Sequence, residues 1–196
     1  IRRQKKAVGG YYASGAYMDA QVGKGMEALR ENGLEEKTIV IFTSDHGYHL
    51  GEHDMWSKVS VHKESAQVPL IISVPGKKPA VCHSFAELLD LYPTTSSLCG
   101  LKISGNLQGK DISRLLDNPN LKVRDAVLSS GKGMLYREEK WAYIHYGKSG
   151  ELYDMEKDPK QYNNLIDDPQ YAEVLSGMKE KLKAKLTEIR KNDLGI

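Results

Sequence analysis

The apolar positions of the chain follow a helical spacing near its start and become continuous further on. In residues 13–32 they form one stripe of a helix, which Asn32 and Gly33 end, since glycine is favoured just past a helix. Residues 38–43 and 68–74 are instead unbroken and β-branched, which is typical of strands buried on both faces of a parallel sheet. A helix followed by two such strands predicts an α/β layer structure.

The middle of the chain carries shorter signals. Residues 87–98 fit a helix that Pro93 either bends or starts. Residues 105–110 read as a loop and residues 112–116 as a short helix. The turn at residues 117–120 then predicts a subdomain boundary.

This boundary divides the chain into a core portion, residues 1–118, and a small α+β subdomain, residues 119–196. Four short segments of the subdomain predict an antiparallel meander: residues 123–129, 134–137, 141–146 and 151–153. Residues 171–191 are rich in Lys and Glu and keep one apolar stripe, which predicts a packing helix with a solvated face.

Composition narrows the classes of protein that fit this pattern. Of the 196 residues, 40% are hydrophobic and 28% are charged, as in ordinary globular domains. The 28 Lys and Arg nearly balance the 26 Asp and Glu, so the net charge of +2 argues against a nucleic-acid partner. No apolar stretch is long enough to span a bilayer. The chain begins at Ile1 rather than Met, so we expect it to be processed or cut from a longer chain.

The two cysteines, Cys82 and Cys99, are too few for a disulfide scaffold and lack the spacing of a zinc site. They either pair across a short loop in an oxidising compartment or remain as small buried hydrophobic residues. The sequence leaves both alternatives open.

Residues able to do chemistry gather in the stretch 43–58, which reads TSDHGYHLGEHDMWSK and begins at the end of a predicted buried strand. Open α/β sheets bind their ligands at this place. Asp45 offers hard oxygen to a divalent cation, and His46 offers an imidazole nitrogen beside it. Gly47 lets the backbone approach closely, and Lys58 offers a point charge to a sulfate or phosphate oxyanion.

The same residues also fit a plain turn. Asp45 would then cap backbone amides, and His46 would be a hydrogen-bonded turn residue. His49, Glu52 and His53 fit residues that orient the first metal ligands rather than ligands themselves. Spacing alone does not decide between a metal site and a turn.

Several stretches resemble the second half of the sulfatase family, most closely the iduronate-2-sulfatase-like branch within the alkaline-phosphatase-like superfamily. The resemblance is carried by residues 43–53, then WSK at 56–58, VPLII at 68–72 and PG at 75–76. Further blocks match in the same order: residues 12–23, 87–94, 107–110, 151–159 and 164–165. The fold class that this implies is α/β: the C-terminal part of an alkaline-phosphatase-like mixed sheet with flanking helices, followed by a small subdomain of an antiparallel sheet and a helix.

The resemblance also implies an activity, the hydrolysis of a sulfate monoester. Asp45 and His46 would be two ligands of a divalent cation, usually calcium (Ca²⁺) in sulfatases. Lys58 would contact the sulfate ester, so Lys58 and His46 are the candidate catalytic residues. The cation and the cationic side chains would stabilise charge as the sulfur–oxygen bond breaks. At residues 62–64 the chain departs from the aromatic and acidic residues common in the family. His62 either faces the substrate or has a helix-start or packing role, and it is not among the candidate catalytic residues.

One part of the family's chemistry is absent from the sequence. Sulfatases make their formylglycine nucleophile from the Cys or Ser of a C/S-x-P-x-R motif, and neither Cys82 nor Cys99 lies in one. The acidic pair that usually completes the metal shell is missing too. We therefore expect formylglycine on a missing N-terminal half of the same enzyme, and no turnover by this chain alone.

Other functions and partners stay open. The Asp-His-Gly sequence after a core strand also occurs in phosphodiesterases and phosphonate hydrolases of the same superfamily, and the chain also fits a non-catalytic structural fragment. The substrate expected from the resemblance is a sulfated carbohydrate, and the expected location is periplasmic, secreted or lysosomal. Exposed edges of strands 38–43 and 68–74 predict association with the missing half or self-association.

Overall fold

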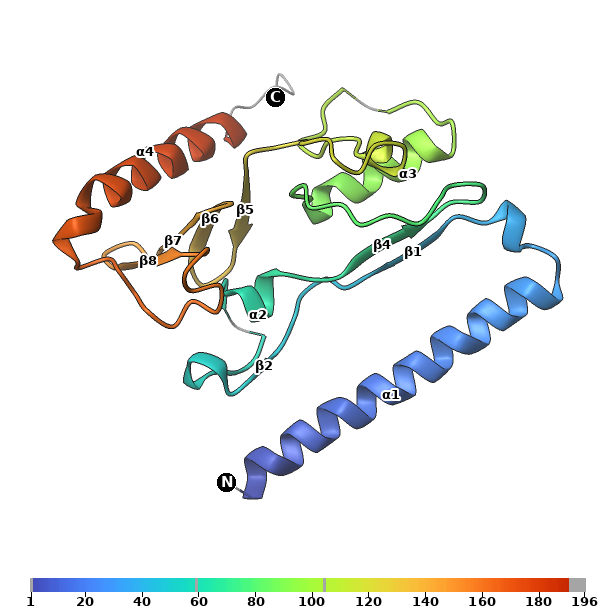
Figure 1. The fold of residues 1–196 in the computed structure, drawn as a ribbon, viewed down its shortest axis with the longest axis horizontal. Coiled ribbons are helices and arrows are strands. Elements are labelled where there is room, and N and C mark those ends of the chain that lie inside the picture. Colours follow the sequence, from blue (N-terminus) through green and yellow to red (C-terminus); the bar gives the residue numbers. More distant parts are fainter. Residues whose placement is uncertain (1, 59, 104, 191–196) are drawn as a thin grey trace.

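The computed structural model describes residues 2–58, 60–103 and 105–190 (Figure 1). Its α-helices are α1 (Arg2–Glu31), α2 (Lys63–Ala66), α3 (Leu91–Leu98) and α4 (Ala172–Ile189). Its strands are β1 (Val40–Thr43), β2 (His49–Leu50), β3 (Trp56–Ser57), β4 (Leu70–Ser73), β5 (Ala126–Ser130), β6 (Met134–Glu138), β7 (Trp141–His145) and β8 (Gly150–Asp154). Short 3₁₀ turns are η1 (Glu35–Lys37), η2 (Glu52–Asp54), η3 (Leu88–Asp90), η4 (Ser113–Leu116) and η5 (Pro169–Tyr171). Helices with small antiparallel sheets confirm the predicted α/β class.

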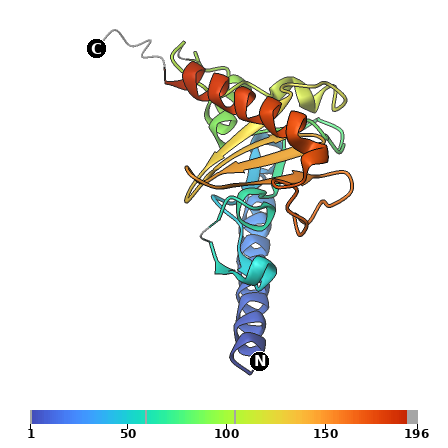
Figure 2. The same ribbon diagram turned by 90° about the vertical axis from the view of Figure 1, so that its left-hand side faces the viewer.

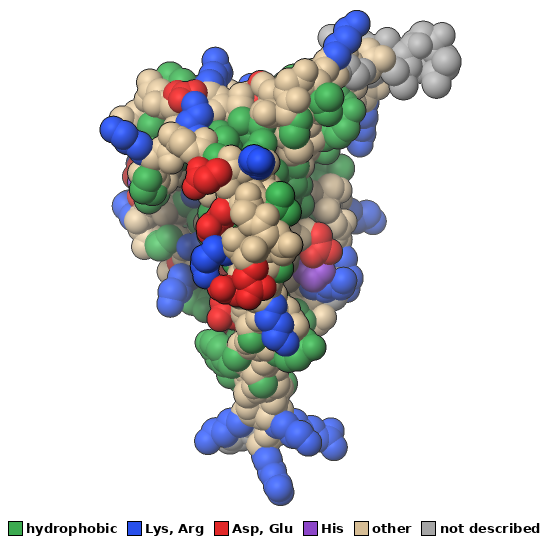
Figure 3. Space-filling model, turned by 90° about the vertical axis from the view of Figure 1, so that its right-hand side faces the viewer, with side chains coloured by type: hydrophobic (Ala, Val, Ile, Leu, Met, Phe, Trp, Pro, Cys, Tyr) green, Lys and Arg blue, Asp and Glu red, His purple; other side chains and the backbone are tan. Residues whose placement is uncertain are grey.

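Helix α1 is longer than predicted and extends away from the rest of the described chain (Figures 1 and 2). It begins at Arg2 because the Arg, Gln, Lys and Ala residues at its start favour helix. Basic side chains gather at this end of the molecule in Figure 3. The end of the helix is as predicted: the Asn32 side-chain amide donates to the Ala28 carbonyl at 2.8 Å, and Gly33 adopts a φ of 63°.

The apolar stripe of α1 is largely uncovered. Tyr17 is 70% exposed, and Tyr12 and Met18 are exposed as well. Tyr11 meets the ring of Tyr48 with the ring centroids 5.2 Å apart. A helix with an apolar stripe gains most of its stability from packing that stripe, so this face fits a contact with further protein.

Strands β1 and β4 pair antiparallel, whereas the sequence predicted strands of a parallel sheet. Val40 lies opposite Ser73 and Thr43 opposite Leu70. The chain between them forms the β2–β3 hairpin and the single turn α2 instead of a crossover helix, and it returns to pair antiparallel. The strands are also only partly buried, and Ile71 is exposed on β4.

The predicted antiparallel meander is confirmed. Strands β5, β6, β7 and β8 pair in sequence order, each antiparallel to the next. The predicted C-terminal helix is confirmed as α4, which lies across one face of this sheet (Figure 2). Met178 and Leu182 of α4 bury their side chains against Tyr143 and Leu152 of the sheet.

Strand β6 shows how the sheet separates two environments. Its even-numbered apolar residues, Met134 and Tyr136, pack toward α4. Its odd-numbered Leu135 packs on the other face, against Val61 of the core portion. Alternation of side chains along a strand therefore sets one face of the sheet toward α4 and the other toward the core portion.

A fully buried carboxylate joins the two predicted portions of the chain. Asp90 accepts hydrogen bonds from both terminal nitrogens of Arg124, with Nη2 at 2.6 Å from Oδ1. The amides of Glu87 and Lys110 donate to the same carboxylate at 2.8 and 2.7 Å. Burial alone would raise the pKa of Asp90, but the hydrogen bonds from Arg124 and the two amides outweigh burial and hold the pKa below its usual value.

Other expectations have mixed outcomes. Pro93 lies in the first turn of α3, so it starts the helix rather than bending it. Cys82 and Cys99 are both free and exposed, so they are neither paired nor buried. Across the described residues, no helix combines the length and hydrophobicity needed to cross a bilayer. The boundary between 1–118 and 119–196 stays a prediction.

The Asp90→Asn substitution is expected to reduce the free energy of unfolding by about 3–5 kcal/mol, because it removes the nearer counter-charge of the buried Arg124 guanidinium and leaves only Glu87 at 3.5 Å. Urea unfolding followed by circular dichroism measures this. Asp125→Asn is the matched control, since Asp125 pairs with Lys122 at 2.9 Å on the surface, where a salt bridge contributes about 0–1 kcal/mol. Equal effects of the two substitutions would contradict the assignment.

The pair of Asp90 and Arg124 also predicts that the free energy of unfolding depends on pH. Because the folded pKa of Asp90 lies below its unfolded value of about 3.9, its contribution is present in full above that value. It is lost as the pH falls through the folded pKa. The stability difference between the wild type and Asp90→Asn should therefore narrow below about pH 4. A difference that is constant down to pH 2 would show that Asp90 does not make this contribution.

Candidate functional site

The three residues singled out in the sequence line one open cavity. Asp45 and His46 lie just after β1, Lys58 lies just after β3, and all three face a hollow of about 830 Å³. This volume is within the range of roughly 300–1,000 Å³ typical of small-molecule sites. The fold therefore brings together residues that are thirteen positions apart in the sequence.

Asp45 and His46 present neighbouring donor atoms. The imidazole Nδ1 lies 2.9 Å from the Gly47 carbonyl, which can only accept a hydrogen bond. A neutral ring then carries its proton on Nδ1 and keeps the lone pair on Nε2. This Nε2 lies 3.5 Å from the Asp45 carboxylate, a spacing that fits adjacent ligands each about 2.4 Å from one cation. The Asp45 side chain is 83% exposed.

Lys58 follows a turn of strained backbone. Of the four non-glycine residues with positive φ in the described chain, three come just before it: His53 and Asp54 at 55°, and Ser57 at 77°. Such conformations cost free energy and persist only where surrounding contacts hold them. Pairing of His49 with Ser57 closes the turn. The Lys58 side chain is exposed at the cavity and makes no ion pair with any carboxylate of the described residues.

Gly47 sets the path of the chain beyond the candidate ligands. Its amide donates to the Ser65 carbonyl at 2.9 Å. A Cβ at this position would lie 1.9 Å from the Glu64 carbonyl oxygen, so only glycine allows the approach. The loop that carries Asp45 and His46 is thereby fixed against α2.

His49 anchors the segment after Lys58 and does not contact the candidate ligands. Its side chain is fully buried, and its Nε2 lies 2.7 Å from the Ser60 hydroxyl. Burial lowers the pKa of His49, and the nearby Glu64 carboxylate only partly offsets this. His49 thus acts as a buried hydrogen-bonding residue behind Ser60, which lines the cavity.

His62 joins the same wall to the C-terminal sheet. Its Nε2 lies 2.8 Å from a carboxylate oxygen of Glu151 on β8, and its ring stacks on His53 with the centroids 4.3 Å apart. Burial would raise the pKa of Glu151, but the hydrogen bonds with His62 and Tyr153 and the nearby imidazoles of His62 and His53 together outweigh burial and leave the pKa below its usual value. His62 is the N-cap residue of α2 and does not line the cavity, so its position fits the expected helix-start and packing roles.

The far wall of the cavity comes from the C-terminal subdomain, which the sequence did not indicate. Residues of β5, β6 and the turn between them face the hollow, along with the segment before η3. Gly131 in that turn packs close to Val61, where an added Cβ would lie 3.2 Å from a Val61 methyl group. The period-two alternation of β6 is the sequence signal that could have found this wall.

The described residues alone do not make a complete metal site. No group of three or more His, Cys, Asp or Glu side chains there is arranged to hold a metal ion. Asp45 and His46 fit two ligands, whereas Ca²⁺ takes six to eight oxygens. Further ligands would have to come from outside the described residues.

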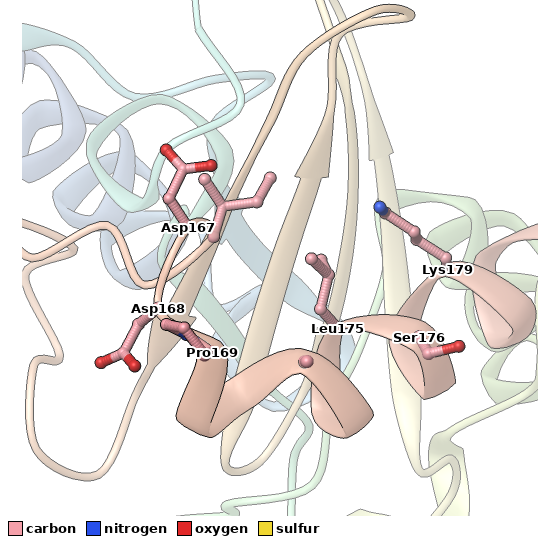
Figure 4. Close-up of a pocket in the computed structure, with 8 residues that line it drawn as sticks. Asp167, Asp168, Pro169, Leu175, Ser176 and Lys179 are labelled. Atoms are coloured by element: carbon pink, nitrogen blue, oxygen red, sulfur yellow. The ribbon is translucent and has the colours of Figure 1, made fainter.

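A second hollow of about 300 Å³ lies at the start of α4, far along the chain from these residues (Figure 4). It is lined by Ile166, Asp167, Asp168, Pro169, Ala172, Leu175, Ser176 and Lys179. Asp168 accepts from the Gln170 amide at 2.9 Å, which is an ordinary helix cap.

Comparisons with known proteins identify the family and the relatives of this chain. The family model described as Sulfatase matches residues 2–101. The chain belongs to the sulfatase family. It is 30% identical over 188 residues to an arylsulfatase of Clostridium perfringens, an alignment that covers 90% of this chain and 39% of that protein. Bovine arylsulfatase K is 33% identical over 194 residues, with 89% of this chain and 35% of that protein covered.

Solved structures share the fold of this sulfatase chain. A 2-O GAG sulfatase superposes with a TM-score of 0.80 at 28% identity, covering 91% of this chain and 42% of that one. A phosphonate monoester hydrolase of Agrobacterium radiobacter superposes with a TM-score of 0.78 at 28% identity, covering 88% and 40%. The chain therefore spans about two fifths of the proteins it matches. The iduronate-2-sulfatase-like branch stays a prediction.

The Gly47→Ala substitution is expected to lower the free energy of unfolding by about 1–3 kcal/mol, because the added methyl group must displace the Glu64 backbone. Differential scanning calorimetry measures the loss. Gly177→Ala in α4 is the matched control, since nothing lies within 4 Å of its added Cβ. There alanine should stabilise the helix by about 0.5–1 kcal/mol. A Gly47→Ala protein as stable as the wild type would show that this approach is not tight.

Proposed function

We propose that this chain is part of an enzyme that hydrolyses sulfate monoesters, a sulfuric ester hydrolase, and that it supplies residues for the metal and the sulfate group. The observation that carries the proposal is the convergence of Asp45, His46 and Lys58 on one cavity in a chain of the sulfatase family. Arylsulfatases and a choline-sulfatase among its relatives support it.

Each of these three residues has a proposed role. Asp45 and His46 Nε2 would hold a divalent cation, with Ca²⁺ expected from the family, and the bound cation would supply charge stabilisation as the sulfur–oxygen bond breaks. Lys58 would place its ammonium group against a sulfate oxygen and stabilise the same developing charge. The Gly47 carbonyl holds the proton of His46 on Nδ1, so Nε2 stays available.

The nucleophile is proposed to lie outside this chain. The sequence contains no C/S-x-P-x-R motif from which formylglycine could be made. We therefore propose that the remaining part of the same enzyme carries it and completes the metal shell. The uncovered stripe of α1 and the exposed Ile71 of β4 fit surfaces that this part would cover.

The substrate class is proposed to be a sulfated carbohydrate. Relatives include a ulvan-active sulfatase of Formosa agariphila, and a solved neighbour is a 2-O GAG sulfatase. A periplasmic, secreted or lysosomal location follows from the same family. Both proposals concern the whole enzyme.

A phosphonate or phosphodiester hydrolase is the second candidate. The phosphonate monoester hydrolase of Agrobacterium radiobacter matches the fold almost as well as the sulfatase neighbour. Metal analysis of the full-length enzyme, combined with a panel of sulfate monoesters, phosphodiesters and phosphonates, separates the two. Stoichiometric zinc with preference for phosphorus esters would favour this second function.

Lys58→Ala and Asp45→Ala in the full-length enzyme are each expected to lower kcat/KM for an aryl sulfate at least a hundredfold, by analogy with the loss of an oxyanion donor. Asp45→Ala should also lower the bound metal measured by elemental analysis. Lys78→Ala is the control, because Lys78 is exposed and lies outside the cavity lining. Wild-type kcat/KM in both site variants would overturn the assignment and favour a non-catalytic structural role.

This chain produced alone is expected to show no sulfatase turnover and to self-associate, because the stripe of α1 stays uncovered. Size-exclusion chromatography with light scattering measures the state. Tyr17→Glu combined with Met18→Glu should shift the chain toward monomer, whereas Glu substitution of the neighbouring polar Gln21 should not. A monodisperse monomer of the unaltered chain would contradict the prediction.

A further inference from the structure

A guanidinium group without a carboxylate partner faces the cavity from its far wall. Arg137 follows Leu135 by two positions on β6, so both side chains leave the sheet on the face toward the core portion. Arg137 lines the same cavity as Asp45, His46 and Lys58. Its side chain is half-buried.

The contacts of Arg137 fix its orientation and leave most of its donors unused. The guanidinium carbon lies 5.5 Å from the centroid of the Phe85 ring, which also lines the cavity. Nη1 donates to the Glu139 backbone carbonyl at 2.8 Å. The Glu139 carboxylate itself is bound by Lys122 at 3.0 Å. Within the described residues no carboxylate lies in ion-pair distance of Arg137, so one of its five N–H donors is engaged.

The surroundings of Arg137 are basic. Lys58, Lys63 and Lys132 also line the cavity. Glu87, the acidic residue on the same side, accepts from the Leu128 amide at 2.9 Å and is paired with the buried Arg124 at 3.5 Å. Burial lowers the pKa of Arg137, which Glu139 only partly offsets, so the free protein carries a poorly solvated charge there.

We propose that Arg137 is a specificity residue that binds a second anionic group of the substrate, a carboxylate or a further sulfate, while Lys58 binds the sulfate to be removed. This rests on the proposed sulfatase function. A planar guanidinium held on an aromatic ring offers two parallel N–H groups, which match the oxygens of a carboxylate or sulfate. Lys132 in the β5–β6 turn, which Gly131 holds against Val61, adds a second positive charge to the same cavity. The favoured substrate is therefore a sugar sulfate with at least two negative groups.

The test compares Arg137→Gln with the wild type in the full-length enzyme. The probes are 4-nitrophenyl sulfate, a disulfated hexosamine, and a sulfated disaccharide that contains a uronic acid. The doubly charged sugars are measured as substrates, or as competitive inhibitors of 4-nitrophenyl sulfate hydrolysis where they are not turned over. Arg137→Gln should keep kcat/KM for 4-nitrophenyl sulfate within about twofold. It should weaken recognition of at least one doubly charged sugar by about ten- to a hundredfold.

The two sugar arms identify the group that Arg137 binds. A loss confined to the uronic acid disaccharide assigns a carboxylate, and a loss confined to the disulfated hexosamine assigns a second sulfate. Arg137→Lys should recover only part of the loss, because it keeps the charge and loses the paired N–H groups. Lys140→Gln is the matched control: Lys140 lies 5.7 Å over the Trp141 ring on the same sheet, outside the cavity lining, and should change nothing.

Several outcomes would overturn the proposal. Equal losses on all three probes would show that Arg137 supports the fold, and an unchanged variant would show that it binds nothing. Wild-type enzyme that neither hydrolyses nor is inhibited by the doubly charged sugars would overturn it too. If the full-length enzyme had no sulfatase activity, the proposed function would be wrong, whatever the role of Arg137. Isothermal titration of the same sugars against wild type and Arg137→Gln would then decide whether Arg137 binds them.

Discussion

The buried pair of Asp90 and Arg124 is the constraint on which the two-walled site depends. One carboxylate gathers a guanidinium and the amides of Glu87 and Lys110, and so joins the start of α3, the loop before η4 and the entry to β5. Such a pair is stable only when every polar atom is satisfied. Because it is, the C-terminal sheet has one position relative to the core portion.

A second connection holds the opposite side of the same junction. His62 of the core portion pairs with Glu151 of β8, and the Lys63 amide donates to the Gln161 side chain at 2.8 Å. These two contacts thus attach the segment that follows Lys58 to the C-terminal subdomain. Asp90 with Arg124 and His62 with Glu151 connect the same two portions of the chain whose residues line the cavity.

Local signals predicted the elements well, and long-range pairing was where prediction failed. The meander of β5 to β8 and helix α4 follow from short turns and helical periodicity, which are properties of neighbouring residues. The antiparallel pairing of β1 with β4 depends on how the chain of residues 44–69 returns, and apolar composition does not encode it. The start of α1 was missed because Gly9 and Gly10 interrupt the apolar pattern without ending the helix.

In the candidate site, too, the sequence indicated individual residues but not the contacts between distant ones. Asp45, His46 and Lys58 were found by residue type and by resemblance, and the structure places them on one cavity. Asp90 was hidden inside an apolar helix pattern, where a lone carboxylate among leucines is the signal to follow. The contact of His62 with Glu151 joins residues 89 positions apart, so no window of sequence could reveal it.

On strand β6, the residues that pack against α4 and the residue proposed to bind substrate lie on opposite faces. Its residues that face α4 bury apolar area, so changes there alter stability. Arg137 faces the cavity, where it contributes little to packing and can differ without disturbing α4. The turn from β5 to β6 has the same freedom at Lys132, since Gly131 alone makes the close approach to Val61. The proposed division of labour, with Asp45, His46 and Lys58 on one wall and Arg137 on a strand face that can vary, requires this separation of the two faces of β6.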